Sequence, residues 1–398
     1  MSTIATRPPA KASLVNDPKV RGIVYQVVLV GLLVGLIWAA ASNAIDNLRA
    51  AKIASGFGFL DSTSGFDVGQ TLISYSATST YGRAFLVGLL NTLLVAAIGI
   101  VLATFLGFLV GVARLSPNWI VARVATVYVE VIRNLPLLLQ LLFWYIAVLR
   151  ALPEPRASLN AGIGVFLNNR GLYMPRPIVA PDSWLLLASL AFGIVAAIVY
   201  AVGAKRKQAA TGVQSPIGRA TLGFVVGLPL LVWALLALFG TNPISFDFPQ
   251  QTRFNLNGGL QVFPEFVALT LGLTIYTAAF IAEIVRAGIL AVSKGQTEAA
   301  NALGLRSGPT LKLVVIPQAM RVIIPPLTSQ YLNLTKNSSL AVVIGYPDLV
   351  QVFMGTVLNQ TGQAIECVAM TMAVYLTISI VTATIMNEYN RRKALVER

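Results

Sequence analysis

The chain contains no histidine and a single cysteine, Cys367. Without histidine it lacks the commonest proton shuttle and metal ligand, which argues against a metalloenzyme or a Ser-His-Asp hydrolase. One cysteine permits neither an intrachain disulfide nor a cysteine metal cluster. These absences remove the most common kinds of catalytic chemistry, and we expect no catalytic, metal or cofactor-binding residues in this chain.

Charged residues are also scarce. They make up 11% of the 398 residues, whereas 56% are hydrophobic and the mean hydropathy is +0.75. A soluble domain carries roughly a quarter charged residues, so this composition predicts a polytopic membrane protein. A phosphate loop of the form G-x-x-x-x-G-K-[ST], a G-x-S-x-G elbow and an H-E-x-x-H helix are all missing. We therefore expect a chain that is not an enzyme and has no ATPase motif of its own.

Long apolar runs set the expected fold, because a helix needs about 20 apolar residues to cross a bilayer core of about 30 Å. Seven runs meet this length comfortably, at about 23–44, 85–113, 121–149, 183–204, 220–240, 264–292 and 366–388. An eighth, at about 320–346, is weaker because Pro325, Pro326 and Lys336 interrupt it. The sequence thus predicts an all-α membrane bundle of about eight spans.

The first run follows basic residues and could be a cleaved signal peptide. Its apolar stretch is longer than the 7–15 residues or so of a signal sequence, so an uncleaved anchor is favoured. With the N-terminus inside, 19 Lys and Arg residues fall on the cytoplasmic side and 8 on the other. Since cytoplasmic loops carry the basic excess, both termini are expected in the cytoplasm. The net charge of +14 is then a topology signal. It does not indicate nucleic-acid binding, which needs a clustered basic face.

The cytoplasmic connection 293–319 predicts two short helices. Ser293 and Gln296 have the spacing of a capping box, and Gly304 suits the left-handed turn that ends a helix. A second helix then opens near Ser307 and is expected to stop at Pro317.

The first of these helices has a smooth face. Ala299, Ala300, Ala302 and Leu303 form a small apolar surface, and Glu298 lies near the positive end of the helix, where a carboxylate is stabilised. Such a helix suits docking in the groove of a partner protein. An ordinary interfacial helix resting on lipid headgroups is an equal alternative on physical grounds.

Polar or charged residues occur at two places inside or beside the expected membrane spans. Glu130 and Arg133 are three residues apart on one helix face and can pair with each other. The pair can line a pathway or a subunit interface, or it can be a self-neutralised pair near the headgroups. An isolated charge at mid-bilayer costs about 2.5–3.5 kcal/mol on insertion scales, so pairing or a wet surface is expected.

The eighth run is the second such place. Its prolines are expected to break the hydrogen-bond ladder. They are followed by a polar stretch that includes Asn333, Lys336, Asn337 and Ser338. Interrupted helices of this kind commonly line substrate routes, which favours a pathway or gate. The alternative is that Lys336 snorkels to the outer interface.

The connection 293–319 also resembles a known loop. The run Gly295-Gln296-x-Glu298-Ala299-Ala300-x-Ala302-Leu303-Gly304, followed by Ile316-Pro317, is similar to the EAA loop of permease subunits in bacterial ABC importers. The resemblance to the polar amino-acid branch of that family continues through Pro317-Gln318-Ala319, Ile324-Pro325-Pro326 and Lys336-Asn337-Ser338-Ser339-Leu340. It also includes Gly88-Leu89-Leu90-Asn91-Thr92 and Glu130 to Gln140 upstream.

The resemblance implies a type I importer permease fold with a five-helix core in the bacterial inner membrane. It implies import of polar L-amino acids by alternating access, and contact with a separate ATPase through Glu298, Ala299, Ala300, Leu303, Gly304 and Pro317. The implied partners are a second permease subunit, two copies of a cytoplasmic ATPase that binds ATP and magnesium, and a periplasmic amino-acid-binding protein.

An extra first span and an inserted pair of spans resemble the larger subunits of general L-amino-acid importers. The expected organisation is a tail (1–22), an extra span and loop (23–84), a first core part (85–150), an insertion (151–263), a second core part (264–392) and a tail (393–398).

A stand-alone secondary transporter or channel is the alternative function. Ion-coupled carriers usually bury several acidic or histidine relays, and Glu130 is the acid we place well inside a span. A membrane transferase is a more distant alternative, because no plausible pair of nucleophile and base is present.

Overall fold

The computed structural model describes residues 18–50, 56–180, 183–213, 215–240, 244–252 and 255–393. Most of the two expected tails, 1–22 and 393–398, lies outside this part of the chain. The fold has two compact units, one made of Met1–Asn91 and Pro347–Val381 and the other of Thr92–Tyr346 and Thr382–Arg398. Below, the first is called the small unit and the second the large unit.

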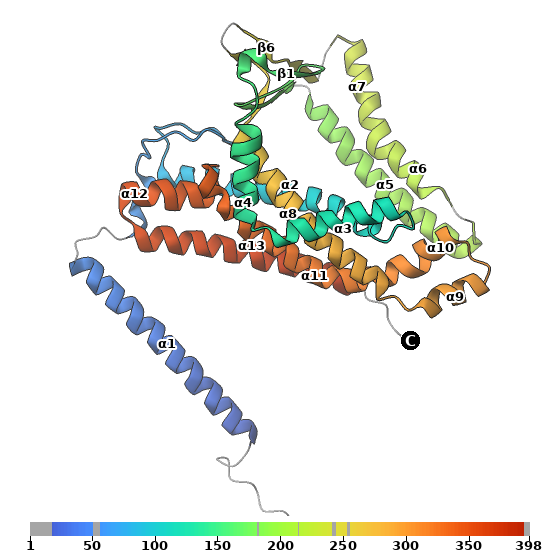
Figure 1. Cartoon of the computed structure of the whole chain (residues 1–398), viewed down its shortest axis with the longest axis horizontal. Helices are drawn as coiled ribbons and strands as arrows, with labels where there is room; N and C mark the ends of the chain where they lie inside the picture. Colours follow the sequence, from blue (N-terminus) through green and yellow to red (C-terminus); the bar gives the residue numbers. More distant parts are fainter. Residues whose placement is uncertain are drawn as a thin grey trace, which may run out of the picture. The chain divides into compact units, whose positions relative to one another are not determined.

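Helices dominate both units (Figure 1). The α-helices are α1 (Pro18–Ala50), α2 (Tyr81–Ala113), α3 (Trp119–Asn134), α4 (Leu137–Leu142), α5 (Trp184–Thr211), α6 (Ile217–Leu222), α7 (Leu228–Leu238), α8 (Pro264–Leu290), α9 (Lys294–Ala302), α10 (Ser307–Thr310), α11 (Ile316–Asn337), α12 (Leu358–Thr361) and α13 (Ala364–Lys393). The 3-10 and π segments are η2 (Phe57–Asp61), η3 (Phe143–Leu149), η4 (Pro155–Ala157), η6 (Gly223–Gly227), η7 (Leu311–Val315), η8 (Ser338–Ile344) and η9 (Val350–Val357).

The membrane-spanning character expected from the sequence is confirmed. Seven stretches of described helix are long and apolar enough to cross a bilayer, and a bent pair of helices makes an eighth. The expected order of strength holds only in part, however. The run 121–149, expected as a regular span, is the bent pair, in which Trp119–Asn134 and Leu137–Leu149 meet at 106°. The run 320–346, expected to be the weakest, has the lowest mean hydropathy of the seven described stretches, 1.3, as expected, but it belongs to one continuous stretch, Ser307–Ile344.

The bend after α3 has a local cause. Pro136 has no N–H, and it disfavours helical backbone in the residue before it; Leu135 is extended, at φ −96° and ψ 132°. The amide of Gln140 donates to the carbonyls of Ile132 and Leu135, both at 3.0 Å. One side chain thus satisfies two carbonyl groups that the break leaves open.

The core of the large unit is built around α8. Fourteen of its 27 residues are buried, and most of them are alanine, glycine or threonine. On α2, a Cβ at Gly107 would lie 2.6 Å from Cβ of Ile281, and one at Gly111 would lie 2.8 Å from Cβ of Val285. The two backbones therefore approach as closely as glycine allows, as small residues permit between membrane helices. Helix α11 packs on α8 as well, and Gly288 lies against Ile323.

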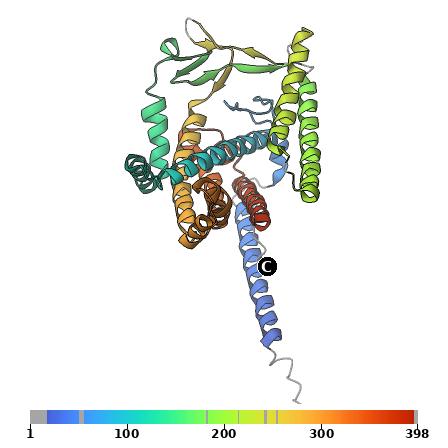
Figure 2. The same cartoon turned by 90° about the vertical axis from the view of Figure 1, so that its right-hand side faces the viewer.

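Short strands cap one end of the large unit, an addition that the sequence did not predict. They are β1 (Leu159–Gly162), β2 (Val165–Asn168), β3 (Gly171–Met174), β4 (Arg176–Val179), β5 (Ile244–Asp247), β6 (Gln250–Gln251), β7 (Leu256–Asn257) and β8 (Leu260–Val262). A four-stranded antiparallel sheet has the order β1-β2-β3-β8, and β4 pairs with β5 and β6 with β7. In Figure 2 these strands bridge from the start of α8 to the ends of α5 and α7.

The small unit has its own core, built from Ala84, Leu349, Val352, Phe353, Val357 and Cys367. The loop before α2 is fastened to this core. Asn91 donates its side-chain amide to the carbonyls of Gln70 and Pro347, both at 2.9 Å. A Cβ on Gly88 would lie 2.9 Å from Cα of Leu349, so the chain passes close to α2 at this point. Gly88 and Asn91, two of the residues that contributed to the family resemblance, thus hold a loop and a turn in place.

Candidate functional site

Helix α9 and its ends form a surface segment at one end of α8. Figure 1 shows α9 beyond the end of α8 that lies opposite the strands. Ser293 is the residue before the helix, but its side chain makes no capping hydrogen bond, so the expected capping box is wrong. The side chain of Gln296 instead accepts a hydrogen bond from Gln318 on α11, at 3.2 Å. Its partner is thus on α11 rather than in its own turn, and the contact ties α9 to α11.

The C-terminal turn of α9 is as predicted. Gly304 has φ +76°, in the left-handed region that favours glycine. Its N–H donates to the carbonyl of Asn301 at 2.9 Å, and Leu305 donates to that of Ala300 at 3.1 Å. These bonds close the helix in the manner of a glycine C-cap.

The face of α9 divides into an inner and an outer side. Ala300 is buried, at 4% exposed. Glu298, Ala299 and Gly304 are exposed, and Leu303 is 83% exposed. A leucine this exposed, beside small residues and a glycine turn, leaves an apolar contact surface with no cover from the described chain. The surface can receive a partner without rearrangement of α9.

Pro317 does not stop the second helix, contrary to the prediction. The chain runs without interruption from α10 through the π segment η7 into α11, where Pro317 is in the first turn. A proline ring clashes with the carbonyl four residues earlier in a regular helix. The wider turns of a π segment relieve that clash and allow the helix to continue.

The prolines of α11 do not break it either. Pro325 and Pro326 lie inside the helix and are exposed. Each removes one backbone hydrogen bond, but Ile323, Ile324 and Leu327 are buried in the core and hold the helix. The backbone changes at the end of the polar stretch, where the 3-10 segment η8 begins at Ser338, and Gly345 ends that segment with φ +76°.

The four proposed pathway residues lie at the C-terminal end of α11, and they do not share one environment. Asn333 and Lys336 are exposed and three residues apart, so they occupy one side of the helix. Asn337 is half-buried. Ser338 is fully buried and donates its hydroxyl to the carbonyl of Thr335 at 2.7 Å. The exposed pair continues the uncovered face that carries the two prolines.

Glu130 and Arg133 do not pair, contrary to the expectation. Arg133 lies instead 3.9 Å from the carboxylate of Glu283 on α8, with its guanidinium 5.1 Å from the ring centre of Phe280. In the part of the chain that the structure describes, no ion pair reaches Glu130, which is exposed. A carboxylate on a neighbouring helix has the better geometry, because α3 packs along α8.

Two acidic residues were missed by sequence reasoning. Glu283 lies inside α8, and the signal for it was Arg286 three residues later, a helix-pairing distance. Asp348 is fully buried and accepts the N–H of Gln351 at 2.8 Å. Burial raises the pKa of Asp348 to about 7, because an ionised carboxylate is costly away from water. Nothing in the pattern around Asp348 indicated burial.

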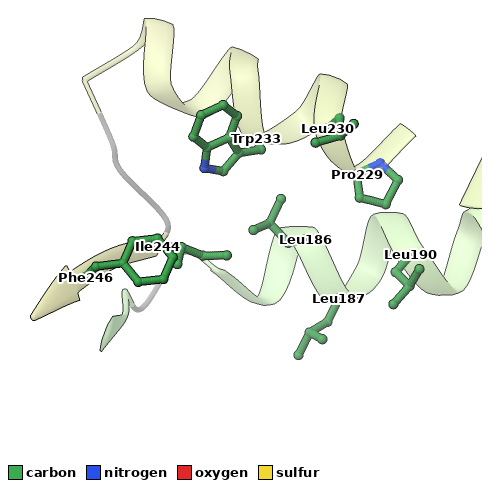
Figure 3. Close-up of a pocket in the computed structure, with 8 residues that line it drawn as sticks. All are labelled: Leu186, Leu187, Leu190, Pro229, Leu230, Trp233, Ile244 and Phe246. Atoms are coloured by element: carbon green, nitrogen blue, oxygen red, sulfur yellow. The ribbon is translucent and has the colours of Figure 1, made fainter. Parts of the chain in front are cut away.

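The inserted helices α5 and α7, together with strand β5, line an open apolar pocket of about 480 Å³, shown in Figure 3. Its lining consists of Leu186, Leu187, Leu190, Pro229, Leu230, Trp233, Ile244 and Phe246. A zwitterionic amino acid would lose its hydration there and gain no polar partner in return. This pocket is therefore not a place for an amino acid and suits an apolar occupant.

Sequence comparisons agree with this geometry. Residues 212–395 match the family model described as binding-protein-dependent transport system inner membrane component. The general L-amino acid transport system permease protein AapQ of Rhizobium johnstonii is 53% identical over 97% of this chain and 95% of its own length. This chain belongs to the family of amino-acid ABC importer permeases.

Two further relatives cover the chain just as fully. The putative amino-acid ABC transporter permease protein YhdX of Escherichia coli is 52% identical over 96% of both chains. The glutamate/glutamine/aspartate/asparagine transport system permease protein BztB of Rhodobacter capsulatus is 44% identical over 99% of this chain and 100% of its own length. The chain is thus a multi-pass inner-membrane subunit that works with an ATPase and a binding protein. The alternative of a stand-alone carrier is not favoured.

Proposed function

We propose that this permease passes polar L-amino acids from the periplasm to the cytoplasm by alternating access. It would do so as one half of a heterodimer, with two copies of a cytoplasmic ATPase and a periplasmic amino-acid-binding protein. The relatives support this substrate class, since their names specify general L-amino acids in one case and glutamate, glutamine, aspartate and asparagine in another. ATP and magnesium would be bound by the ATPase partner, and this chain would carry out no reaction of its own.

The observation that carries the coupling proposal is the exposed surface of α9. The C-terminal end of α9 carries the contact surface. It consists of Leu303, which is 83% exposed, and Gly304, which has a left-handed backbone, with Glu298 and Ala299 beside them. Closure of the ATPase dimer would displace α9 through this contact surface. Only three residues separate α8 from α9, so the displacement would reach the spans directly. The protein then shifts between states because the partner contacts them differently.

In this proposal the exposed side of α11 lines the route. Asn333 and Lys336 offer an amide and an ammonium on a helix face that the described chain leaves uncovered. Asn337 and Ser338 follow at the point where the backbone changes to a 3-10 helix. These groups can pair with the carboxylate or amide of a polar amino acid during passage.

The orientation belongs to the proposal as well. If α9 contacts a cytoplasmic ATPase, the opposite end of α8, with its strand layer, faces the periplasm. Both termini are then cytoplasmic, in agreement with the 19 to 8 distribution of Lys and Arg.

The test is retention of the ATPase on the detergent-solubilised permease, compared for wild type and Gly304→Asp. We expect the variant to insert normally but to lose ATPase binding and uptake, because it puts a charge into the docking surface. Gly212→Asp is the matched control. Gly212 also ends a helix with positive φ, +71°, and neither glycine has an atom within 4 Å of an added Cβ. Retained binding with full uptake in Gly304→Asp would refute the docking assignment.

A further inference from the structure

Glu283 gathers three guanidinium groups from three helices of the large unit. Arg114, the residue after α2, donates a hydrogen bond to one carboxylate oxygen. Arg286 on α8 donates to the other at 2.7 Å, and Arg133 on α3 approaches to 3.9 Å. The carboxylate is 27% exposed and the Arg114 side chain 10%. Arg286 is on the same helix as Glu283, so the contacts that join α8 to its neighbours are those of Arg114 and Arg133.

The three contacts differ in strength, and they divide the helices into two groups. Helices α2 and α8 are joined firmly, by the hydrogen bond to Arg114 and by the close approach at Gly107 and Gly111. The contact of Arg133 at 3.9 Å is longer than a hydrogen bond. Its guanidinium also lies over the face of Phe280, where a cation–π attraction adds to the contact. Helix α3 is therefore the member whose link to Glu283 is the weakest.

Two further features of α3 bear on how it follows α8. Its C-terminal end is the 106° break before α4, where Pro136 already interrupts the backbone ladder. One turn of helix or so away from Arg133, Tyr128 donates to the carbonyl of Ile275 at 2.7 Å, so a hydrogen bond also ties α3 to α8. A rigid connection leads from Glu283 in the other direction, since α8 continues for two turns and then reaches α9.

We propose that Glu283 is a positioning residue of the transport cycle. Its carboxylate carries the displacement of α8 to α2 through Arg114 and to α3 through Arg133, so that the spans move together when α9 is pushed. This inference rests on the proposed docking of α9 to an ATPase. It adds to that proposal a specific residue, Glu283, at which the displacement of α8 is passed on to α2 and α3.

The test is the number of amino acids imported per ATP hydrolysed, in proteoliposomes that hold the full transporter and its binding protein. In Glu283→Gln we expect normal retention of the ATPase, continued ATP hydrolysis and at least a tenfold lower ratio. Glu283→Asp keeps the charge and should recover most of the ratio. Glu265→Gln is the matched control, because Glu265 is on the same helix and bonds only Tyr145 among the described side chains, at 2.7 Å.

Arg133→Gln provides an independent variant if Glu283→Gln fails to accumulate, because the side chain of Arg133 is 39% exposed and the firm contacts stay in place. We expect a threefold or greater loss in the ratio, again with the ATPase retained. An unchanged ratio in either variant overturns the inference. So does a Glu283→Gln transporter that loses its ATPase in proportion to uptake, because the residue would then act on docking. Failure of the wild type itself to retain an ATPase would refute the proposed function instead.

Discussion

Helix α8 and the stretch Ile217–Leu238 of the insertion, which contains α6 and α7, are both long and apolar enough to cross a membrane, yet they pack differently. The stretch Ile217–Leu238 has the higher mean hydropathy, 2.3 against 1.8 for α8, and none of its residues is buried, whereas half of α8 is. Since lipid tails are as apolar as leucine, hydrophobicity does not drive membrane helices together. Small residues do, and α8 buries alanine, glycine and threonine where α7 presents leucine and tryptophan.

The difference divides the helices into a tightly packed core, formed by α2, α8 and α11, and a covering layer, formed by α5, α6 and α7. Helices α2, α8 and α11 meet through glycines and small residues, so a displacement of one is felt by the others. The pair of α5 with α6–α7 makes a close approach at Gly193, beside the backbone of Phe224. Farther along, the pair opens into the apolar pocket. We expect transport to tolerate change in the insertion and not in the core.

The largest effect is expected where α2 meets α8. Gly111→Leu should abolish uptake and reduce the amount of folded transporter, because even a Cβ there would lie 2.8 Å from the carbonyl oxygen of Ala282. Overpacking of this kind costs about 1–3 kcal/mol or more. Fluorescence-detected size exclusion and uptake measure the two effects.

Gly227→Leu is the control, since Gly227 lies in the insertion with no atom within 4 Å of an added Cβ. If both glycines tolerated leucine equally, the distinction between core and covering layer would be lost.

A smaller but still large effect is expected on the uncovered face of α11. Lys336→Ala should lower uptake about tenfold with the ATPase still bound, because the ammonium group lies on the proposed route. Lys205→Ala is the control, with an equally exposed lysine on α5. Transport assays with several amino acids decide the matter, and unchanged uptake with an unchanged substrate range would remove Lys336 from the route.

Asp348, in the small unit, is expected to make the stability of the protein depend moderately on pH. Its pKa is raised to about 7 by burial, from 3.8 for a free side chain. Between these values the unfolded state releases the proton and the folded state keeps it, so stability falls as pH rises from about 4 to 7. We expect a Tm that decreases by a few degrees from pH 5 to pH 8, and a flatter profile in Asp348→Asn.

Asp67→Asn, which changes an exposed aspartate, should leave the profile as it is. Wild-type and Asp348→Asn profiles that run parallel would show that Asp348 is ionised throughout.

The smallest effect is expected in the insertion. Trp233→Ala enlarges the apolar pocket, but its indole is already 42% exposed and lies on a helix with no buried residue. Uptake should stay within about twofold of wild type, because nothing in the core repacks. A fivefold loss would show that the pocket takes part in transport.

Much of this organisation could be predicted from the sequence, because the signals are local. The length of the apolar runs predicted the spans, and the glycine after an alanine-rich turn predicted the end of α9 at Gly304. The predictions based on proline were wrong at three positions. A helix was expected to end or break at Pro317, Pro325 and Pro326, but it continues through all three. The π segment η7 and the buried side chains around the later prolines hold the helix together. At Pro136, where the preceding residue is extended, the same chemistry does bend the chain.

The candidate site was predicted only where it is continuous in sequence. The α9 surface is one segment, and its residue types indicate a contact face. The ion cluster joins Arg114, Arg133 and Glu283 across three helices, and no spacing along the chain brings them together. Arg133 therefore was paired with its neighbour in sequence, Glu130, rather than with its neighbour in space.

One measurement tests the central claim most directly, that α9 is the contact through which a separate ATPase drives this permease. Cys367 is fully buried, so Leu303→Cys in a Cys367→Ser background places a single accessible thiol at the tip of the surface. With a short thiol-to-amine cross-linker in membranes that hold the whole transporter, we predict a product of permease and ATPase whose yield changes with ATP. A thiol that reacts only with soluble maleimide, to the same extent with and without the ATPase, would contradict the account.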